Sequence, residues 1–126
     1  MDERRALGAL GEQLVAEQIQ NWGWEILARN WRCRFGELDI VAREPSSPPT
    51  LVFIEVKTRR RYREELAVPP LDAITVKKVR KLHELAFAWM SDNPGARGKV
   101  RFDAAAVIVD QDKREFEYRR GLDGGR

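Results

Sequence analysis

Apolar residues recur at helical spacing in two separate parts of the chain. Between residues 4 and 22 they fall three or four positions apart, so that a helix would carry them on one face. Asp2 is a candidate N-cap for this helix and Gly23 a candidate stop. A second apolar face runs through residues 71–89 and ends before the turn sequence NPGARG. The apolar positions are Leu7, Leu10, Leu14, Val15, Ile19 and Trp22 in the first helix, and Leu71, Ile74, Val79, Leu82, Leu85, Ala86 and Trp89 in the second.

Five other segments have the pattern of β-strands. The first covers residues 24–34, and the next two lie within residues 36–60, on either side of the turn-rich sequence EPSSPPT. Residues 100–110 form a nearly continuous apolar run, which is typical of a buried strand, and residues 114–120 alternate as an edge strand does. Residues 60–70 carry charges and prolines without periodicity, so we expect a loop there.

The order of these elements is helix, three strands, helix, two strands. It predicts an α/β fold with a mixed sheet of about five strands flanked by helices. The chain has 126 residues, of which 43% are hydrophobic and 34% charged, so we expect one domain over residues 1–120 and a flexible tail over residues 121–126. Cys33 is the only cysteine, which excludes an intramolecular disulfide and favours a reduced, cytoplasmic setting. No stretch approaches the roughly 18 apolar residues of a membrane span.

Positive charge is concentrated in two short runs. The net charge is only +3, although the sequence pI is near 9.3. The sequences KTRRRYR (residues 57–63) and KKVRK (residues 77–81) are the two densest basic runs. Each is either solvated surface or a surface for the phosphates of a nucleic acid. The candidate phosphate-binding residues are Arg59, Arg60, Arg61, Lys77, Lys78 and Lys81.

Two carboxylates stand inside strands that are otherwise apolar. A hairpin centred on Ser47 would pair Arg43 with Leu51, Val41 with Phe53, Asp39 with Glu55 and Glu37 with Lys57. Facing carboxylates repel each other by an amount on the order of 1 kcal/mol, and by more when they are desolvated. Mg²⁺ would offset this repulsion, because it accepts one or two carboxylates and leaves room for water and phosphate. A salt bridge from Lys57 could neutralise the pair instead, without any chemistry.

Two helical residues break the local pattern near the same place. Lys78 lies in the middle of the apolar face of the second helix, where it either extends to the rim or reaches a negatively charged site. Glu12 borders the apolar face of the first helix, close to Gly8 and Gly11. Glycines cost roughly 1 kcal/mol each within a helix, which suggests close packing against the sheet. That packing would bring Glu12 near the two carboxylates; the alternative is a solvated glutamate at the helix edge.

Several short motifs, in order, carry a family resemblance. They are GEQLVA at residues 11–16, RNWR at 29–32, GELD at 36–39, VFIEVKTR at 52–59, Lys78, and RFDAA at 101–105. Together they resemble the YraN-like bacterial family, which is similar to the archaeal Holliday-junction resolvases of the PD-(D/E)xK nuclease superfamily. The resemblance implies a restriction endonuclease-like fold. Leu38 stands where that superfamily has a proline before its first acid.

The resemblance also implies roles for individual residues. Asp39 and Glu55 would be metal ligands for Mg²⁺ or Mn²⁺, and Lys57 the catalytic lysine that positions or polarises the attacking water. Glu12 would be the additional acid on the first helix of resolvase-like members. Because the superfamily also contains members that bind without cutting, the resemblance does not settle the activity.

Other polar and aromatic residues have simpler interpretations. Asp103 stands near Arg101 ahead of an apolar run, and we expect a buried ion pair there. His83 is the only histidine and falls off the apolar face of its helix, so it should be a surface residue and a zinc site is not expected. The four tryptophans are expected in the core. They are Trp22, Trp24, Trp31 and Trp89.

These observations together predict a metal-dependent nuclease that hydrolyses phosphodiester bonds in nucleic acid, with structured or branched DNA favoured. Resolvase-like activity would need two sites and therefore a homodimer. One alternative is a nucleic-acid-binding module on the same fold that does not cut. Another is a structural or partner-binding protein whose acids form a salt-bridge network.

Overall fold

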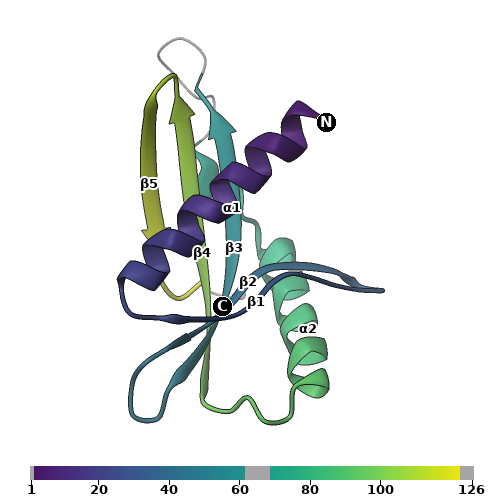
Figure 1. The fold of residues 1–126 in the computed structure, drawn as a ribbon. Helices are drawn as coiled ribbons and strands as arrows, with labels where there is room; N and C mark the ends of the chain where they lie inside the picture. Colours follow the sequence, from purple (N-terminus) through teal and green to yellow (C-terminus); the bar gives the residue numbers. More distant parts are fainter. Residues whose placement is uncertain (1, 62–68, 123–126) are drawn as a thin grey trace.

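The computed structural model describes residues 2–61 and 69–122. Helices α1 (Glu3–Asn21) and α2 (Val76–Asp92) cover opposite faces of one sheet, as Figure 1 shows. The remaining elements are β1 (Glu25–Cys33), β2 (Gly36–Glu44), β3 (Thr50–Arg60), the 3-10 helix η1 (Pro70–Ala73), β4 (Lys99–Asp110) and β5 (Lys113–Arg119). Neither helix within the described residues is long and apolar enough to cross a membrane.

The five strands follow chain order across the sheet, β1-β2-β3-β4-β5. Neighbours that are joined by tight turns are antiparallel, whereas β3 and β4 are parallel because α2 lies between them in the chain. The predicted mixed sheet and the predicted order of helices and strands are therefore confirmed. Residues 62–68 of the predicted loop, and residues 123–126 of the predicted tail, lie outside the described residues.

The face of the sheet under α1 is built from alternate residues of the strands. Val15 and Ile19 of α1 are fully buried against side chains from all three central strands, such as Ile54. Gly11 allows the helix to approach β3 closely, because a Cβ atom there would lie 1.8 Å from Oγ1 of Thr58. The expected close packing is confirmed at Gly11. It does not extend to Gly8, where an added Cβ would meet nothing within 4 Å.

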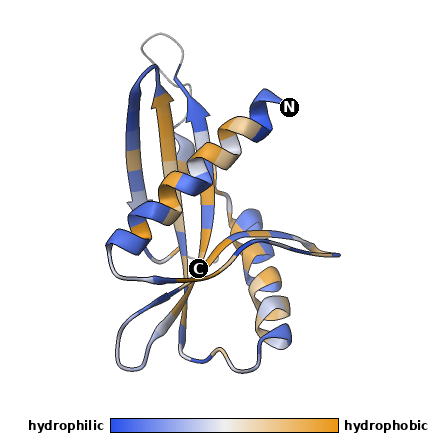
Figure 2. Ribbon diagram, in the orientation of Figure 1, coloured by the Kyte–Doolittle hydropathy of each residue, from blue (hydrophilic) through white to orange (hydrophobic). Residues whose placement is uncertain are grey.

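The opposite face is covered by α2 and η1. Leu82, Leu85 and Trp89 of α2 pack on Leu38 and Phe53, and the Trp89 and Phe53 rings meet edge to face with centroids 5.8 Å apart. Figure 2 shows the outcome for the sheet as a whole, with hydrophobic residues along β4 and hydrophilic ones along the edge strand β5 and the upper end of β3. Along β3, buried residues therefore end at Glu55, and the polar residues from Lys57 to Arg60 lie outside the core.

The beginning of the second helix differs from the prediction. Leu71 belongs to η1, and Ile74 has an extended backbone, so neither residue is part of α2. The helix instead begins at Val76, after Thr75, whose Oγ1 accepts a hydrogen bond from the backbone N–H of Lys78 at 3.2 Å. Pro70 begins the short η1 turn, which ends at the extended backbone of Ile74, and Thr75 then starts a new helix as its N-cap. Leu71 nevertheless packs on the sheet, as its apolar character implies.

The tryptophans are buried to different degrees. Trp24 and Trp89 are buried in the core as predicted, and Trp31 is partly buried. Trp22 is 40% exposed, so the prediction was wrong for this residue. It caps the C-terminal end of α1 and packs edge to face on Trp24 and Tyr118, with ring centroids 5.2 and 5.0 Å apart, which leaves its other side in solvent.

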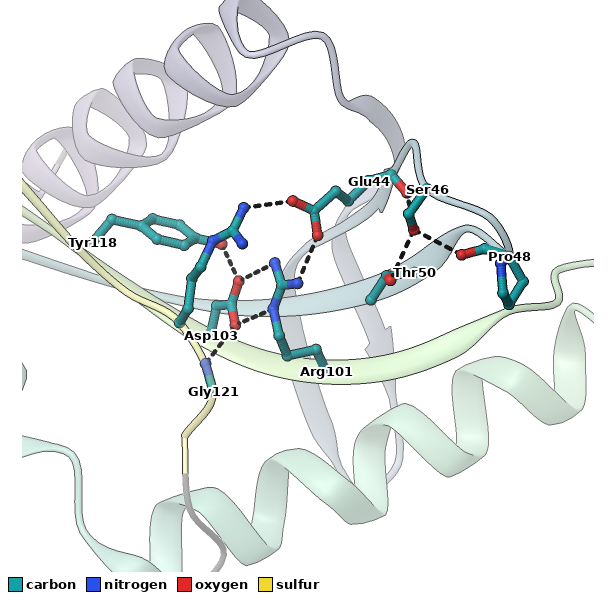
Figure 3. Close-up of polar contacts among 9 residues, drawn as sticks. Glu44, Ser46, Pro48, Thr50, Arg101, Asp103, Tyr118 and Gly121 are labelled. Carbon is teal, nitrogen blue, oxygen red and sulfur yellow. Dashed lines mark hydrogen bonds and ion pairs between the residues drawn. The ribbon is translucent and has the colours of Figure 1, made fainter.

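Asp103 is fully buried on the α1 face of the sheet, and both of its carboxylate oxygens accept hydrogen bonds. Figure 3 shows Arg101 donating to both of its carboxylate oxygens, at 2.9 and 3.0 Å. The Tyr118 hydroxyl and the backbone N–H of Gly121 donate to the same carboxylate. The predicted buried ion pair is therefore confirmed. Burial, followed by the adjacent Asp103 charge, raises the pKa of Tyr118 and keeps its hydroxyl protonated.

The same network joins the end of β2 to the end of the described chain. Arg101 also donates to Glu44 at 2.6 Å, and Arg120 donates to the other oxygen of that carboxylate. Although burial opposes ionisation of Glu44, the hydrogen bonds and charges of these two arginines lower its pKa. Both guanidinium groups lie over the Trp24 ring, 5.5 and 5.6 Å from its centroid. This region is a satisfied structural network, with no carboxylate left without a cation.

Candidate active site

The candidate site lies where β2 separates from β3. The two strands pair from Glu44 with Thr50 to Ile40 with Ile54, including the predicted pairs of Val41 with Phe53 and Arg43 with Leu51. Asp39 and Glu55 occupy the next position in this register, just beyond the last pair. The predicted register is therefore confirmed up to the acids, where the regular ladder ends.

Asp39 replaces the missing rung of the ladder with its side chain. Its Oδ2 accepts a hydrogen bond from the backbone N–H of Val56 at 2.8 Å. Because the strands separate here, Glu37 does not reach Lys57, and this predicted pairing was wrong. Glu37 instead forms an ion pair with Arg32 across the β1–β2 hairpin, with Nε and Oε2 3.4 Å apart.

The environment of Asp39 strongly favours its protonated form. Burial, followed by the negative charge of Glu55, raises the pKa of Asp39 to about 8, although the Val56 N–H opposes this shift. A hydrogen bond with the Glu55 side chain and the charge of Glu12 raise the pKa further. Asp39 is thus a partly buried carboxyl group whose charged neighbours are the acids Glu55 and Glu12.

Glu55 is the most buried of the acids at the site, with 6% of its surface exposed. Its Oε2 contacts two ammonium groups, Lys57 Nζ at 3.4 Å and Lys78 Nζ at 3.1 Å. Lys57 follows it on the same face of β3, and Lys78 reaches it from the first turn of α2. Of the two alternatives for Lys78, the structure therefore shows the one in which its ammonium group reaches a negatively charged site. Its neighbour Lys81 pairs with Glu84 at 3.6 Å.

Glu12 approaches the same acids from α1. Burial, followed by the charge of Glu37, raises its pKa; Arg29 opposes the shift, and Glu55 adds to it. Asn30, with its amide nitrogen turned toward the acids, donates to Glu12 Oε1 at 2.6 Å and to Glu37 Oε1 at 3.0 Å. The close packing at Gly11 is what brings this turn of the helix to the end of β3.

Asn30 is a residue of this site that sequence reasoning missed. Its backbone has φ of 51°, in the left-handed region that asparagine tolerates better than most residues. This conformation lies in the middle of β1, where a strand pattern gives no reason to expect it. The available signal was a lone asparagine between apolar and basic residues of a strand, which β-propensity disfavours.

The predicted phosphate-binding residues lie on α2 and on β3, and they differ in exposure and in the ion pairs that they already make. On α2, Lys77 is exposed and Lys81 is exposed apart from its pairing with Glu84. On β3, Arg59 is exposed, and Arg60 is partly buried, with its Nε 3.8 Å from Glu3 Oε1. Arg61 differs, because its guanidinium contacts both Glu115 and Asp110, which already offset its charge.

Two hollows lie near the site, one next to Glu12 and the other next to Glu55. One, of about 650 Å³, lies between α1 and the end of β3; its lining includes Glu12, Lys57, Arg59 and Arg60. The other, of about 180 Å³, lies between the β1–β2 hairpin and α2 and includes Glu37, Glu55, Lys78 and Lys81. Each hollow thus contains acids of the site together with basic residues. An anionic ligand could contact the cations at the rim while one of its groups approached the acids.

Comparison with known proteins identifies the relatives of this chain. A family model described as Uncharacterised protein family UPF0102 matches residues 11–107. The chain belongs to this family. The match spans Glu12, Asp39, Glu55, Lys57 and Lys78, so every acid and lysine of the site lies within the family's own region.

Several relatives of this UPF0102 member are similar over most of their length. A UPF0102 protein of Acidothermus cellulolyticus is 44% identical over 131 aligned positions, covering 94% of this chain and 93% of the relative. Another, of Nocardia farcinica, is 41% identical over 107 positions, covering 85% and 80%. A third, of Mycolicibacterium vanbaalenii, is 44% identical over 108 positions, covering 86% and 84%. The names of these relatives state no activity, so the residues of the site are the available indication of function.

Proposed function

We propose that this protein is a metal-dependent nuclease that hydrolyses phosphodiester bonds in nucleic acid, with structured or branched DNA as the favoured substrate. Its sequence motifs resemble those of the PD-(D/E)xK superfamily, and the mixed sheet with a helix on each face is compatible with a restriction endonuclease-like fold. A fold alone does not establish an activity, so the proposal depends on the acids at the end of β3.

The observation that carries the proposal is the pairing of Asp39 with Glu55. The partly buried Asp39 and the buried Glu55 occupy adjacent positions of neighbouring strands. Burial, followed by the charge of Glu55, raises the pKa of Asp39 to about 8. A divalent cation at this point would favour the ionised form of both, because an opposite charge nearby lowers a carboxyl pKa. The donor set is all oxygen, which suits Mg²⁺ or Mn²⁺ better than zinc.

The number of acids at the site also suits magnesium. Among the described residues, no three His, Cys, Asp or Glu side chains are grouped closely enough to hold a metal ion together. Mg²⁺ is commonly held by one or two carboxylates, with water and substrate phosphate in its other positions. Asp39 and Glu55 would therefore be the protein ligands. A metal held there would lower the pKa of a bound water and offset the charge on the attacked phosphate.

The neighbouring side chains can each take part in phosphate chemistry. Lys57 and Lys78 place two ammonium groups beside Glu55, where they could contact the phosphate or orient water. Burial, followed by the charge of Glu37, raises the pKa of Glu12, which favours the protonated form that a general acid requires. The exposed cations Arg59, Lys77 and Lys81, and the partly buried Arg60, would hold flanking phosphates, which gives affinity without sequence reading.

One observation favours a second candidate, a nucleic-acid-binding module that does not cut. Lys57 and Lys78 already neutralise Glu55, so the site has internal compensation for one of its two charges. A salt-bridge network without any ligand is the third candidate. Metal dependence separates the nuclease from both, and salt-dependent affinity for nucleic acid separates the binding module from the network.

A cleavage assay tests the proposal directly. Single-stranded, duplex, flap and four-way DNA are incubated with the protein and Mg²⁺, Mn²⁺ or EDTA. We expect metal-dependent cleavage that Asp39→Asn and Glu55→Gln abolish, whereas Asp112→Asn, a change in an exposed turn, leaves it intact. Binding without metal-dependent cleavage would establish the second candidate instead. Light scattering on the same samples tests for the homodimer that paired cuts require.

The salt dependence of binding tests the basic surface. The logarithm of duplex affinity should fall with the logarithm of salt concentration by about 0.9 per phosphate neutralised. Replacing Arg59 and Arg60 together by Ala should flatten this slope by roughly 2 units. Arg61→Ala should change it less, because Glu115 and Asp110 already contact that guanidinium. An equal effect of Arg61 would show that its ion pairs open on binding.

A further inference from the structure

The tip of the β1–β2 hairpin presents an aromatic ring to solvent. Arg34 and Phe35 form a two-residue turn between Cys33 and Gly36, and the Phe35 ring is 40% exposed. Figure 1 shows this hairpin projecting past the rest of the sheet, next to α2. An aromatic residue at an exposed turn contributes little to a core, so its presence needs another explanation.

This ring lies beside the candidate active site. Gly36, the next residue, packs on α2: a Cβ atom there would lie 3.6 Å from Leu85 and 3.7 Å from Lys81 Cε. Gly36 also lines the same hollow of about 180 Å³ as Glu55 and Lys78. A nucleic acid with one phosphate at Glu55 would therefore have neighbouring nucleotides near the hairpin tip.

Two cations lie near the ring. Arg34 places its guanidinium carbon 4.8 Å from the ring centroid, and Lys81 Nζ lies 5.9 Å from it. Arg32 is exposed on the same hairpin. An aromatic face bordered by cations matches a nucleotide, whose base can stack on the ring while its phosphate meets the charge. An apolar protein partner would instead leave these cations desolvated and unpaired.

We propose that Phe35 is a stacking platform for an unpaired nucleobase next to a phosphate that Lys57 and Lys78 contact beside Glu55. This inference rests on the proposed function, because it takes nucleic acid as the ligand of the site. In a continuous duplex both faces of each base are covered by neighbouring bases, so the ring gains no contact there. At a single strand, a flap or a junction a base face is free, and Phe35 thereby selects for such structures.

Binding without cleavage tests this inference separately from the catalytic proposal. Affinity for a labelled single-stranded oligonucleotide and for a duplex of the same sequence is measured by fluorescence anisotropy in EDTA. We compare the wild type with Phe35→Ala, Phe35→Leu and Phe35→Trp. Phe87→Ala is the matched control, since Phe87 is 72% exposed on α2 and outside both the site and the hairpin.

We expect Phe35→Ala to weaken single-strand binding by about 5- to 150-fold, the usual effect of losing one stacked base, with duplex affinity unchanged. Phe35→Leu should weaken it similarly, because it keeps apolar bulk without a ring. Phe35→Trp should restore binding, and Phe87→Ala should have no effect. Melting temperatures should match the wild type for all variants, because neither ring is buried.

Three results would overturn the inference. An equal loss on single strand and duplex would make Phe35 a general contact, and no loss on either would remove it from the interface. Conversion of a wild-type dimer to monomers by Phe35→Ala, seen by light scattering, would assign the tip to a protein interface. Metal-dependent cleavage by the wild type with any of these results leaves the nuclease proposal standing. A selective loss of single-strand affinity in Phe35→Ala, together with no cleavage by the wild type, would support base stacking by Phe35 in a protein that binds nucleic acid without cutting it.

Discussion

Replacing Asp39 by asparagine removes a charge from the site while preserving the shape of the side chain. In the folded protein, burial and the neighbouring Glu55 raise the pKa of Asp39 from 3.8 to about 8. The amide oxygen of asparagine can still accept the hydrogen bond from the Val56 N–H that Asp39 now accepts. The substitution therefore isolates the electrostatic cost of ionising this carboxyl group.

The sign and size of the effect follow from proton linkage. The folded state holds the Asp39 proton more tightly than the unfolded state, so stability falls as pH rises from about 4 to about 8. At about 1.4 kcal/mol per pKa unit, the cost is close to zero at pH 3 and reaches about 4 kcal/mol at pH 7. Metal-free Asp39→Asn should therefore be more stable than the wild type at pH 7, with about 4 kcal/mol as the upper bound.

Urea unfolding at pH 4, 6, 7 and 8.5 in EDTA measures this difference. The gap between Asp39→Asn and wild type should widen as pH rises. Asp112→Asn, an exposed change, should stay within about 0.5 kcal/mol of the wild type throughout. Adding Mg²⁺ at 100 times its dissociation constant should stabilise the wild type by about 2.7 kcal/mol and leave Asp39→Asn unchanged.

The opposite signs would refute the reasoning. If Asp39→Asn were less stable than wild type in EDTA at pH 7, the carboxylate would be a stabilising partner rather than a repelled one. If the wild type were also indifferent to Mg²⁺ and Mn²⁺, the metal site would have to be abandoned in favour of a structural network.

Two further predictions concern packing and buried charge. Gly11→Ala should cost roughly 1–3 kcal/mol, because it forces Thr58 away from its position, whereas Gly8→Ala meets nothing within 4 Å and should stabilise the protein by roughly 0.5–1 kcal/mol. Thermal unfolding of the two variants measures both effects, and equal effects would contradict the close contact at Gly11. Asp103→Ala should cost roughly 3–5 kcal/mol in urea unfolding, because it leaves Arg101 without its buried partner, and a loss under 1 kcal/mol would show that the network reorganises.

Much of the fold was predictable because burial leaves a regular pattern in the sequence. Alternation along β2 and β3 was enough to set the register from Ser47, and that register placed Asp39 beside Glu55. Lys78 was recognisable because a lysine in the middle of an apolar helical face either extends to the rim or reaches a negatively charged site, and the structure places its ammonium beside Glu55. These predictions depended only on periodicity and charge.

The remaining features depend on backbone geometry that periodicity does not encode. The strand pattern continues through Leu38 and Asp39, so it gave no sign that β2 pairs with β3 only from Ile40 to Glu44. For the same reason the pairing of Glu37 with Lys57 was wrong. The left-handed backbone of Asn30 and the contacts it makes with Glu12 and Glu37 depend on the twist of the hairpin, which only the three-dimensional structure shows.

The hydrogen bond from Val56 to Asp39 gives one side chain two separate reasons to be kept. Asp39 completes the sheet at the point where the backbone ladder stops, as well as facing Glu55. A relative that had lost all chemistry would still need an acceptor here to anchor its hairpin, and aspartate or asparagine would serve equally. Because asparagine would also avoid the cost of ionising a carboxyl group beside Glu55, retention of aspartate in a relative favours a role for its charge, whereas a change to asparagine would mark a lineage that keeps the architecture without that role.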